Sequence, residues 1–321
     1  MGKLDKSDYA ILYQLDLDAR QTNSQIAKKV RLSKEVVGYR ISRLIKDGII
    51  QGFYSVIDTT KLGYLNVRIF LRFKNSNPIE EKEILDFFSK KPNSWWVNSI
   101  SGSNLDLGVA FWVKDIAEFS QIKNEFLGKY RERIENYRDS IYSAIYIWNR
   151  AYLKQDAQKK QLSIPPQSKI VTQNEKDLRI LATMADDARI SIVDIASKVG
   201  LSVTAVQHRL KKLRKNGVII GYRAKLNLSK IEHYWYKVEF QLEDYSKKKQ
   251  LLGYFAAHPN IVYAYESIGG GADLEMELEV KSPEEFKKIM DGIKTKFKDA
   301  IRNYNHYLWT EEYKILFFPS G

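Results

Sequence analysis

A strongly basic segment in the second half of the chain carries the side chains that phosphate binding requires. Residues 202–216 contain five Lys and Arg and no Asp or Glu, whereas residues 33–47 contain four cations and two acids. Like charges three or four positions apart on a helix repel each other, so an anionic partner would stabilise them. A solvated charged face is the alternative, since most charge runs are only that. The lack of any acid among residues 202–216 favours a surface for an anionic polymer.

The composition of the chain excludes several kinds of chemistry. Its 321 residues carry 52 Lys and Arg against 39 Asp and Glu, and this net charge of +13 favours a polyanionic partner. The absence of Cys excludes disulfides, thiolate metal sites and cysteine nucleophiles, and the four His are scattered. We therefore expect no metal and no cofactor. No apolar run approaches the length of a membrane span, so we expect a soluble, cytoplasmic and nucleoid-associated protein.

The chain is a tandem duplication. Residues 8–52 align with residues 177–221 without a gap at an offset of 169, and 19 of the 45 positions are identical. The similarity continues more weakly at an offset of 167, where NLDLGVAFWV matches GADLEMELEV and IENY matches IRNY. Each repeat therefore takes about half of a chain that exceeds the usual size of one domain.

Each repeat begins with three short segments whose apolar residues have helical spacing. Between the second and third segments, VRLS and VGLS are typical of a tight turn in which Ser33 and Ser202 cap the next helix. Gly200 fits the left-handed residue that ends a helix, and Arg31 stands at that position in the first repeat. Two short helices followed by a more basic helix form the pattern of a helix-turn-helix. The buried face of the third helix is expected to carry Val37, Ile41 and Leu44, or Val206, Leu210 and Leu213.

The rest of each repeat changes to the period of a β-strand. GIIQGFYSVI and GVIIGYRAKL follow the basic helices, and we expect them to form a wing-like strand pair. Residues 66–73 and 273–280 alternate, which predicts strands with one face in water and glutamates on that face. Strands and helices then follow in the order βαββαβ, which is that of a ferredoxin-like sandwich. The helices are expected near residues 79–90, 115–130, 246–257 and 283–298.

These elements make an α+β protein with two copies of the same two-domain unit. The segment KQDAQKKQLSIPPQSKIVTQ is polar, basic and interrupted by Pro165 and Pro166, which predicts a linker. We place winged helix-turn-helix domains at residues 1–62 and 172–231, ferredoxin-like domains at 63–153 and 232–321, and the linker at 154–171.

The sequences LSKEVVGYRISRLIKDGIIQGFYSVID and LSVTAVQHRLKKLRKNGVIIGYRAKLN resemble the helix-turn-helix of the Lrp/AsnC, or feast/famine, transcription regulators. The resemblance covers nearly the whole chain, twice. It implies a sequence-specific regulator that binds double-stranded DNA and whose ferredoxin-like domain is the RAM-type domain of the family. Family members usually carry one copy and dimerise through those domains. This chain therefore resembles a dimer fused into one polypeptide, a pseudo-dimeric monomer whose self-association would use the sandwich domains.

A recognition helix in the major groove would present the residues opposite its buried face. These positions carry different residue types in the two repeats, so we expect two unlike half-sites. Gln207 has the pattern to read adenine and Glu35 to read cytosine. Arg40 and Arg209 match the Arg of the family pattern, and each could contact phosphate or pair with an aspartate of the first helix. The expected DNA contacts are Lys34, Glu35, Tyr39, Arg40, Ser42, Arg43, Thr204, Gln207, His208, Arg209, Lys211, Lys212 and Lys215.

The resemblance also implies a small effector, such as an amino acid, bound near the sheet interface. Gly102, Asp106, Gly270 and Asp273 stand where SGSNLDL and GGGADLE match the Gly and Asp-Leu of the family. A residue that hydrogen-bonds within its own turn is an equally good interpretation of each aspartate. The run Gly269–Gly271 is not followed by Lys-Ser or Lys-Thr and lies between two strands, which favours a turn over a phosphate loop.

Two further functions stay open on the sequence. Some Lrp-like proteins are paired or fused enzymes that decarboxylate a sirohaem-type tetrapyrrole, which requires a His and several Arg around the substrate carboxylates. The sandwich strands here offer His306 with Arg302 and little else, so we expect a protein that is not an enzyme. A sequence-tolerant, chromatin-like DNA-binding protein also fits the net charge of +13. It differs from a specific regulator only in its ratio of specific to non-specific affinity.

Overall fold

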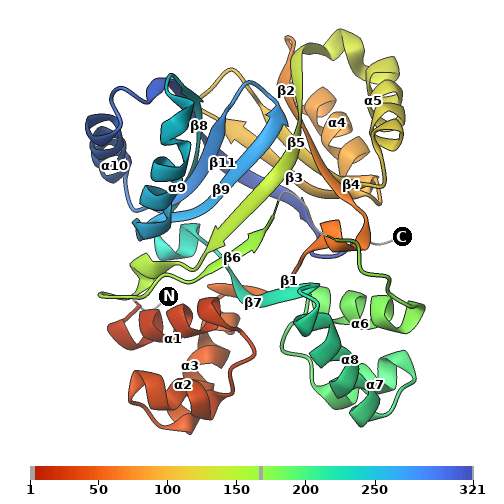
Figure 1. Ribbon diagram of the computed structural model, residues 1–321, viewed down its shortest axis with the longest axis vertical. Helices are drawn as coiled ribbons and strands as arrows, with labels where there is room; N and C mark the ends of the chain where they lie inside the picture. The colour runs from red at the N-terminus through yellow and green to blue at the C-terminus, as the bar shows by residue number, and fades with distance from the viewer. Residues whose placement is uncertain (1–3, 166–168, 320–321) are drawn as a thin grey trace.

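The computed structural model describes residues 4–165 and 169–319, and it has a β-barrel at one end and two helical heads at the other (Figure 1). Each head is a three-helix unit, as expected from the apolar spacing. The buried faces of the third helices carry the predicted apolar residues. The first head contains α1 (Lys6–Leu17), α2 (Asn23–Val30) and α3 (Lys34–Lys46), and the second contains α6 (Glu175–Ala185), α7 (Ile192–Val199) and α8 (Val203–Lys215).

The turn before each third helix has the predicted geometry. The Ser33 hydroxyl accepts a hydrogen bond from the Val36 amide at 3.2 Å, and Ser202 caps α8 in the same way. Gly200 ends α7 in the left-handed conformation, with φ of 65°. Arg31 takes the same conformation at the end of α2, with φ of 57°. An Arg at this position is strained because its Cβ crowds the neighbouring carbonyl.

The two strands that follow the third helices pair with each other across the halves. β1 (Ile50–Ile57) and β7 (Ile219–Leu226) form an antiparallel two-stranded ribbon in which Tyr54 lies opposite Arg223. The expected wing strands are therefore present, but the partner of each is the equivalent strand of the other repeat. Strand propensity could not identify this partner, because the two strands are far apart in the sequence. The ribbon lies between the heads and the barrel (Figure 1).

Eight of the nine strands of the main sheet close into a barrel. Each half contributes the expected βαββαβ order, and edge strands join the halves at β3–β11 and β5–β9. β2 pairs with both β4 and β5, so the ring β2-β4-β3-β11-β8-β10-β9-β5 closes on itself. The strands are β2 (Leu65–Phe73), β3 (Ser94–Ser101), β4 (Leu107–Val113), β5 (Ile134–Trp148), β8 (Tyr234–Leu242), β9 (Ile261–Gly269), β10 (Leu274–Val280) and β11 (Ile301–Ile315).

Four helices cover the outer face of the barrel (Figure 1). Phe88 and Phe126 pack between the helices and the sheet of the first half, and Phe255 and Met290 do so in the second. Both sandwich cores therefore lie outside the barrel wall, and the opposite sheet face becomes the barrel interior. The helices are α4 (Pro78–Lys90), α5 (Ile116–Tyr130), α9 (Lys248–Ala257) and α10 (Pro283–Lys296).

The prediction that the glutamates of residues 273–280 face water is wrong. Glu275, Glu277 and Glu279 are buried, because barrel closure turns the polar face of β10 inward. Glu275 forms a bidentate pair with Arg68 of the other half, at 2.6 and 2.7 Å, and a second pair with Lys237 at 2.7 Å. Burial alone would raise the pKa of Glu275, but Arg68 and Lys237 hold that pKa far below its usual value. The carboxylate therefore stays charged inside the barrel.

Part of the predicted linker is folded. β6 (Gln161–Ile164) pairs with the end of β5, and together they form a hairpin against the barrel. The Lys159 ammonium anchors this hairpin by donating hydrogen bonds to the carbonyl oxygens of Phe255, His258 and Ile261 at 2.6–2.9 Å. Pro165 follows the strand directly, whereas Pro166 lies outside the described residues.

A buried carboxylate joins the first head to the ribbon and the barrel. Asp16 of α1 accepts hydrogen bonds from Arg223 of β7 and from Arg150 just beyond β5, each at 2.8 Å. Arg150 in turn pairs with Glu279 of β10 at 2.8 Å. Burial would raise the pKa of Asp16, but the neighbouring Arg223 and Arg150 outweigh it and lower the pKa. We call this four-residue network the Asp16 tether.

The second head has no such network at the aligned positions. Ala185 replaces Asp16, Tyr54 replaces Arg223 and Phe317 replaces Arg150. Tyr54 instead stacks on Phe317, with ring centroids 4.0 Å apart. The two heads are thus held by different chemistry, by ion pairs on one side and aromatic packing on the other.

The strained turn of the first head yields a stability prediction. Arg31→Gly should raise the free energy of unfolding by up to about 1 kcal/mol, because Gly adopts the left-handed conformation without a Cβ clash. Gly200→Ala, at the equivalent position, should lower it by a similar amount. Urea unfolding followed by circular dichroism measures both changes. A loss of stability in Arg31→Gly would contradict this account.

The Asp16 tether yields a second prediction. Asp16→Ala leaves buried cations without their carboxylate and should cost roughly 3–5 kcal/mol of stability. Glu132→Gln, which removes an exposed carboxylate, should change stability by less than about 0.5 kcal/mol. Thermal unfolding of the two variants beside the parent protein makes the comparison. Equal stability of Asp16→Ala and Glu132→Gln would show that the tether does not stabilise the fold.

Candidate nucleic-acid interface

The third helix of each head offers a solvent-exposed face beside its buried one. On α3 the exposed residues include Lys34, Glu35, Tyr39 and Ser42, and Tyr39 is 69% exposed. On α8 they include Thr204, Gln207, His208, Lys211, Lys212 and Lys215. Both faces belong to heads at the end of the molecule remote from the barrel helices (Figure 1). Most of the residues predicted to contact DNA are therefore brought together on two accessible helices.

Three of the predicted DNA contacts are engaged in ion pairs within their own head. Arg40 lies 2.8 Å and Arg43 2.6 Å from the Asp8 carboxylate, and Arg209 lies 2.7 Å from Asp177. Hydrogen bonds to Asp5 and then to Asp8 raise the pKa of Arg40 above its usual value. Of the two roles considered for Arg40 and Arg209, the structure contains the ion pair with the first helix. A phosphate contact by these residues stays a prediction.

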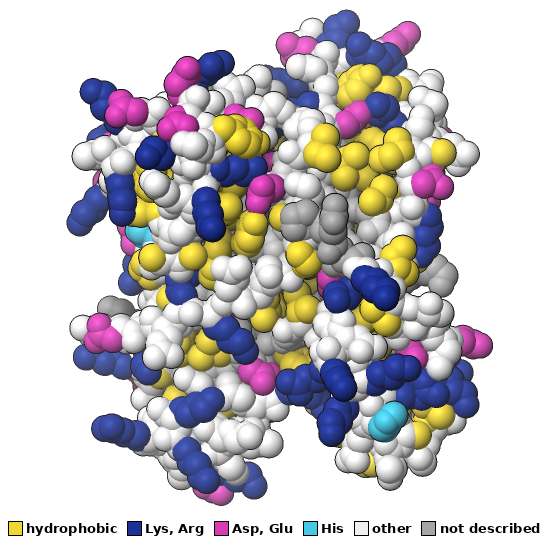
Figure 2. All heavy atoms as spheres, viewed as in Figure 1, with side chains coloured by type: hydrophobic (Ala, Val, Ile, Leu, Met, Phe, Trp, Pro, Cys, Tyr) yellow, Lys and Arg dark blue, Asp and Glu magenta, His cyan; other side chains and the backbone are white. Residues whose placement is uncertain are grey.

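The remaining cations are distributed unequally between the heads. Within the described part of the chain, Lys34 and Lys46 are the cations of α3 outside ion pairs, and α3 also carries Glu35. α8 has more such cations and no acid: Lys211, Lys212, Arg214 and Lys215. Lys and Arg side chains are prominent on both heads and beside the gap between them (Figure 2). α8 consequently has more unpaired positive side chains than α3, and stronger phosphate binding by the second head stays a prediction.

The side chains in position to reach base edges differ between the heads. Gln207 of α8 aligns with Gly38 of α3, where an added Cβ would come within 3.1 Å of the Asn23 amide nitrogen. His208 aligns with the exposed Tyr39. A long polar side chain in one helix therefore corresponds to bare backbone in the other.

The predicted effector residues lie in the turns between β3 and β4 and between β9 and β10. The Asp106 carboxylate accepts hydrogen bonds from the Phe73 amide at 2.8 Å and from Arg72, and Asp273 accepts one from the Leu242 amide at 2.7 Å. The glycines Gly102 and Gly270 take positive φ angles of 85° and 74°. These contacts give all four residues a structural role in the turns, and effector binding by them stays a prediction.

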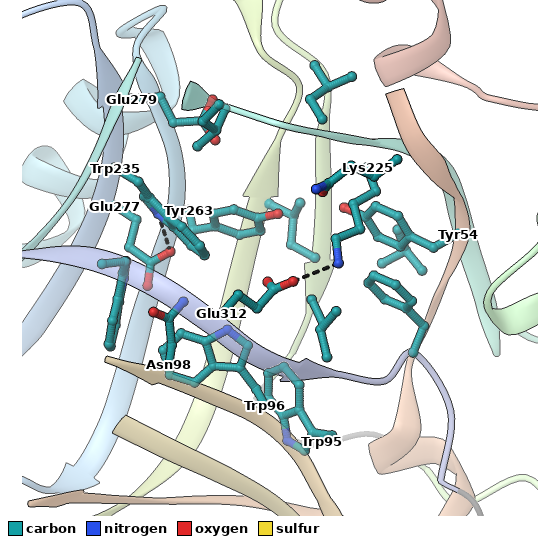
Figure 3. A pocket seen from close by; sticks show the side chains of 18 of the residues that line it. Tyr54, Trp95, Trp96, Asn98, Lys225, Trp235, Tyr263, Glu277, Glu279 and Glu312 are labelled. Carbon is teal, nitrogen blue, oxygen red and sulfur yellow. Dashed lines mark hydrogen bonds and ion pairs between the residues drawn. The ribbon is translucent and has the colours of Figure 1, made fainter. Parts of the chain in front are cut away.

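A cavity of about 1070 Å³ lies between the ribbon and the open end of the barrel. Figure 3 shows aromatic side chains such as Trp96, Trp235 and Tyr263 around it, with charged residues from the ribbon and the barrel strands. Its charged groups are largely paired: Lys225 of the ribbon lies 2.6 Å from Glu312 of β11 (Figure 3). Arg150, at its edge, belongs to the Asp16 tether.

The residues considered for catalysis do not converge. The His306 ring packs against Phe286 with centroids 4.9 Å apart, and burial lowers the pKa of His306. Arg302 is exposed and pairs with Glu243 at 2.6 Å. Across residues 4–165 and 169–319, no group of three His, Asp or Glu side chains is placed to hold a metal ion. No helix in that part of the chain is long and apolar enough to cross a membrane.

Comparison with known proteins identifies the heads and the family. A family model described as winged helix-turn-helix DNA-binding matches residues 4–51 and 173–220. The leucine-responsive regulatory protein of Haemophilus influenzae is 49% identical over 51 residues, 16% of this chain and 31% of that protein. A proline dehydrogenase transcriptional activator of Rhodobacter capsulatus is 36% identical over 118 residues, 36% of this chain and 75% of that protein. The chain belongs to the Lrp/AsnC family of DNA-binding transcription regulators.

Other comparisons bear on the duplication. An HTH-type transcriptional regulator of Pyrococcus horikoshii is 28% identical over 149 residues, which are 92% of that protein but 46% of this chain. One repeat of this Lrp/AsnC protein thus corresponds to a whole relative. A solved structure, the siroheme decarboxylase NirDL, superposes with a TM-score of 0.65 over 98% of this chain and 94% of that one, at 16% identity. At that identity the likeness concerns the fold alone.

Sequence reasoning missed the residues that fix the heads to the barrel. Asp16, Arg150 and Arg223 have no distinctive motif, and the bonds from Asp16 to the two arginines span 134 and 207 positions of the chain. The available signal was the alignment of Asp16 with Ala185, because it places a charged residue at a position that is apolar in the other repeat. A buried charge at such a position indicates a partner on another element.

The unpaired cations of α8 yield a salt-dependence prediction. Lys211→Ala combined with Lys212→Ala should reduce the slope of log affinity against log salt by about 0.9 for each phosphate that the variant no longer neutralises. The double variant Lys287→Ala and Lys288→Ala removes an equal charge from exposed positions of α10 and serves as the control. Fluorescence anisotropy with a labelled duplex at several salt concentrations measures the slopes. Equal slopes for the two double variants would remove Lys211 and Lys212 from the interface.

Proposed function

We propose that a single chain of this regulator reads an asymmetric DNA site. Its two recognition helices differ from each other, and each reads one half-site. The observation that carries the proposal is the difference between the exposed faces of α3 and α8 on heads held by one ribbon. A homodimer presents two copies of one helix and matches a palindrome. This fused pseudo-dimer presents two different helices, which match two different sequences.

The positions of the heads support simultaneous binding. Both heads lie on the side of the ribbon away from the barrel (Figure 1). The ribbon pairs β1 with β7 from Ile50 opposite Leu226 to Ile57 opposite Ile219. A short paired ribbon limits the separation of the heads better than a flexible linker would. We expect half-site centres about one helical turn, or roughly 10 base pairs, apart on one face of the duplex.

Individual side chains suggest what each head reads. The Gln207 amide can donate one hydrogen bond and accept another, which matches the major-groove edge of adenine. The Glu35 carboxylate can accept a hydrogen bond from the amino group of cytosine. Lys211 and Lys212 lie on the same helix as Gln207 and carry charge for the adjoining phosphates. The second head would therefore supply more of the affinity, while both heads supply specificity.

We also propose that the protein has no decarboxylase activity. A substrate with several carboxylates needs several cations free to bind them. Three cations line the barrel cavity, and two of them, Arg150 and Lys225, are paired with carboxylates, which leaves Lys281 as the cation of the described lining outside an ion pair. His306 packs against Phe286, whereas Arg302 pairs with Glu243, so the two side chains have different partners. Spectra of the protein mixed with sirohaem, unchanged over hours of incubation, would support this proposal.

Selection of random duplexes at physiological salt tests the reading of DNA. The parent protein should enrich a non-palindromic site with two half-sites. Gln207→Ala should relax one half-site and Glu35→Ala the other, each at a cost of about 1–3 kcal/mol in discrimination against the wrong base. The unaffected half-site serves as the internal control in each selection. A strict palindrome would contradict the asymmetric reading, and no enrichment at all would indicate a chromatin-like protein.

A further inference from the structure

A basic cleft lies where the two heads meet the β5–β6 hairpin. It has a volume of about 810 Å³, and its cations come from three separate parts of the molecule. The first head provides Arg20 and Lys29, the hairpin provides Lys159 and Lys160, and the end of α8 provides Arg214. One small molecule in this cleft would contact both heads and the barrel at once.

The positive charge of the basic cleft is not balanced by acids. Across the described ranges of the chain, none of its five cations is within ion-pair distance of a carboxylate, whereas the barrel cations are paired. Arg20 donates to the Ala188 carbonyl at 2.6 Å and Lys29 to the Gln21 side-chain oxygen at 2.5 Å, both neutral acceptors. The lining contains one acid, Asp18, whose carboxylate accepts from the Arg20 backbone amide. An anion would therefore find several positive side chains and a single carboxylate in the lining.

Lys159 anchors the hairpin that forms one wall of the basic cleft. Its ammonium donates to the carbonyl oxygens of Phe255, His258 and Ile261, which lie outside the cleft lining, and burial lowers the pKa of Lys159 to about 7. Burial in the absence of a nearby carboxylate is the arrangement that disfavours the charged form of a lysine. The cations of the lining that remain for an anion are therefore Arg20, Lys29, Lys160 and Arg214.

The duplicated half lacks most of these charges, which shows that the basic cleft is not a general property of the fold. Arg214 aligns with Ile45, and Leu17 and Gln25 of the cleft align with Asp186 and Asp194. Two cations of the cleft align with a cation in the other half: Arg20 aligns with Arg189, and Lys29 aligns with Lys198. The pseudo-symmetric position is thus close to neutral, and the positive site occurs on one side of the molecule.

The cleft lies at the wrong end of the recognition helix for base contacts. Arg214 follows Val203, the first residue of α8, by eleven positions, which corresponds to about 16 Å along a helix. The residues that face base edges are at the N-terminal end of α8. A small anion fits the cleft better than the DNA backbone does.

We propose that the basic cleft binds a small polyphosphorylated anion, which bridges the first head, the second head and the barrel. Cations on three elements require a ligand with more than one phosphate group, and the volume leaves room for an organic substituent such as a nucleoside. Any effect on operator affinity would rest on the proposed function, whereas binding itself does not. By fixing Arg214 relative to Lys29, the anion would hold the two heads at one separation.

Isothermal titration calorimetry of the full chain, without DNA, tests the site with three probes: tripolyphosphate, ATP and adenosine. Tripolyphosphate and ATP should bind with one molecule per chain, and adenosine should not bind. Tighter binding of ATP would indicate a nucleotide as the source of the phosphates, and equal binding would indicate inorganic polyphosphate. Lys29→Ala and Arg214→Ala should each weaken binding by about tenfold, because each removes one charge-assisted hydrogen bond.

Lys198→Ala is the matched control, because Lys198 is the counterpart of Lys29 in the other half. It should leave the affinity for tripolyphosphate within about twofold of the parent value. No binding of either phosphate probe would overturn the proposal. Equal losses of affinity in Lys29→Ala and Lys198→Ala would also overturn it, since they would indicate non-specific attraction to net charge. Because DNA is absent from the titration, these outcomes are independent of how the heads read their operator.

Discussion

The structure depends on ion pairs in which each half of the chain provides one partner. Three of them have the same polarity, with arginine from the first half and glutamate from the second. A first half paired with its own copy would leave Arg68 and Arg150 without their β10 glutamates, because Gly108 and Trp112 stand where the second half has Glu275 and Glu279. Burying an unpaired charge is costly, so the pairs favour one half beside the other over two identical halves. The pairs are Arg68–Glu275, Arg138–Glu239, Arg150–Glu279 and Asp16–Arg223.

This division of charge explains why the heads are free to differ. In a homodimer, a substitution in the recognition helix changes the reading of both half-sites together. In a fused chain, the same substitution changes the reading of one half-site only. The heads here differ in their attachment as well as in their DNA-facing residues. Asp16 connects the first head to Arg150 and Arg223, while Tyr54 on Phe317 occupies the equivalent place at the second. The first head is therefore attached through charge-assisted hydrogen bonds and the second through stacked aromatic rings.

Local features of the fold could be predicted from the sequence, and long-range pairing could not. The caps at Ser33 and Ser202 and the helix end at Arg31 follow from neighbouring residues alone. The alternation around Glu275 is the same for a strand that faces water and for one that lines a closed barrel. Only the closure of the sheet, together with a cation supplied by Arg68, 207 positions away, decides between them. The candidate interface was accessible to prediction because each of its two parts lies on a single helix, α3 or α8.

The ribbon and the basic cleft together define how the heads can move. The heads join opposite ends of the ribbon, since β1 follows α3 at Ile50 and β7 follows α8 at Ile219, so a twist of β1 against β7 changes the angle between α3 and α8. Lys29 and Arg214 line the cleft from opposite heads. Their like charges repel, which favours a wider separation when the cleft is empty of anions. In the proposed complex an anion between Lys29 and Arg214 would remove that repulsion, which would link the spacing of the half-sites to the occupancy of the cleft.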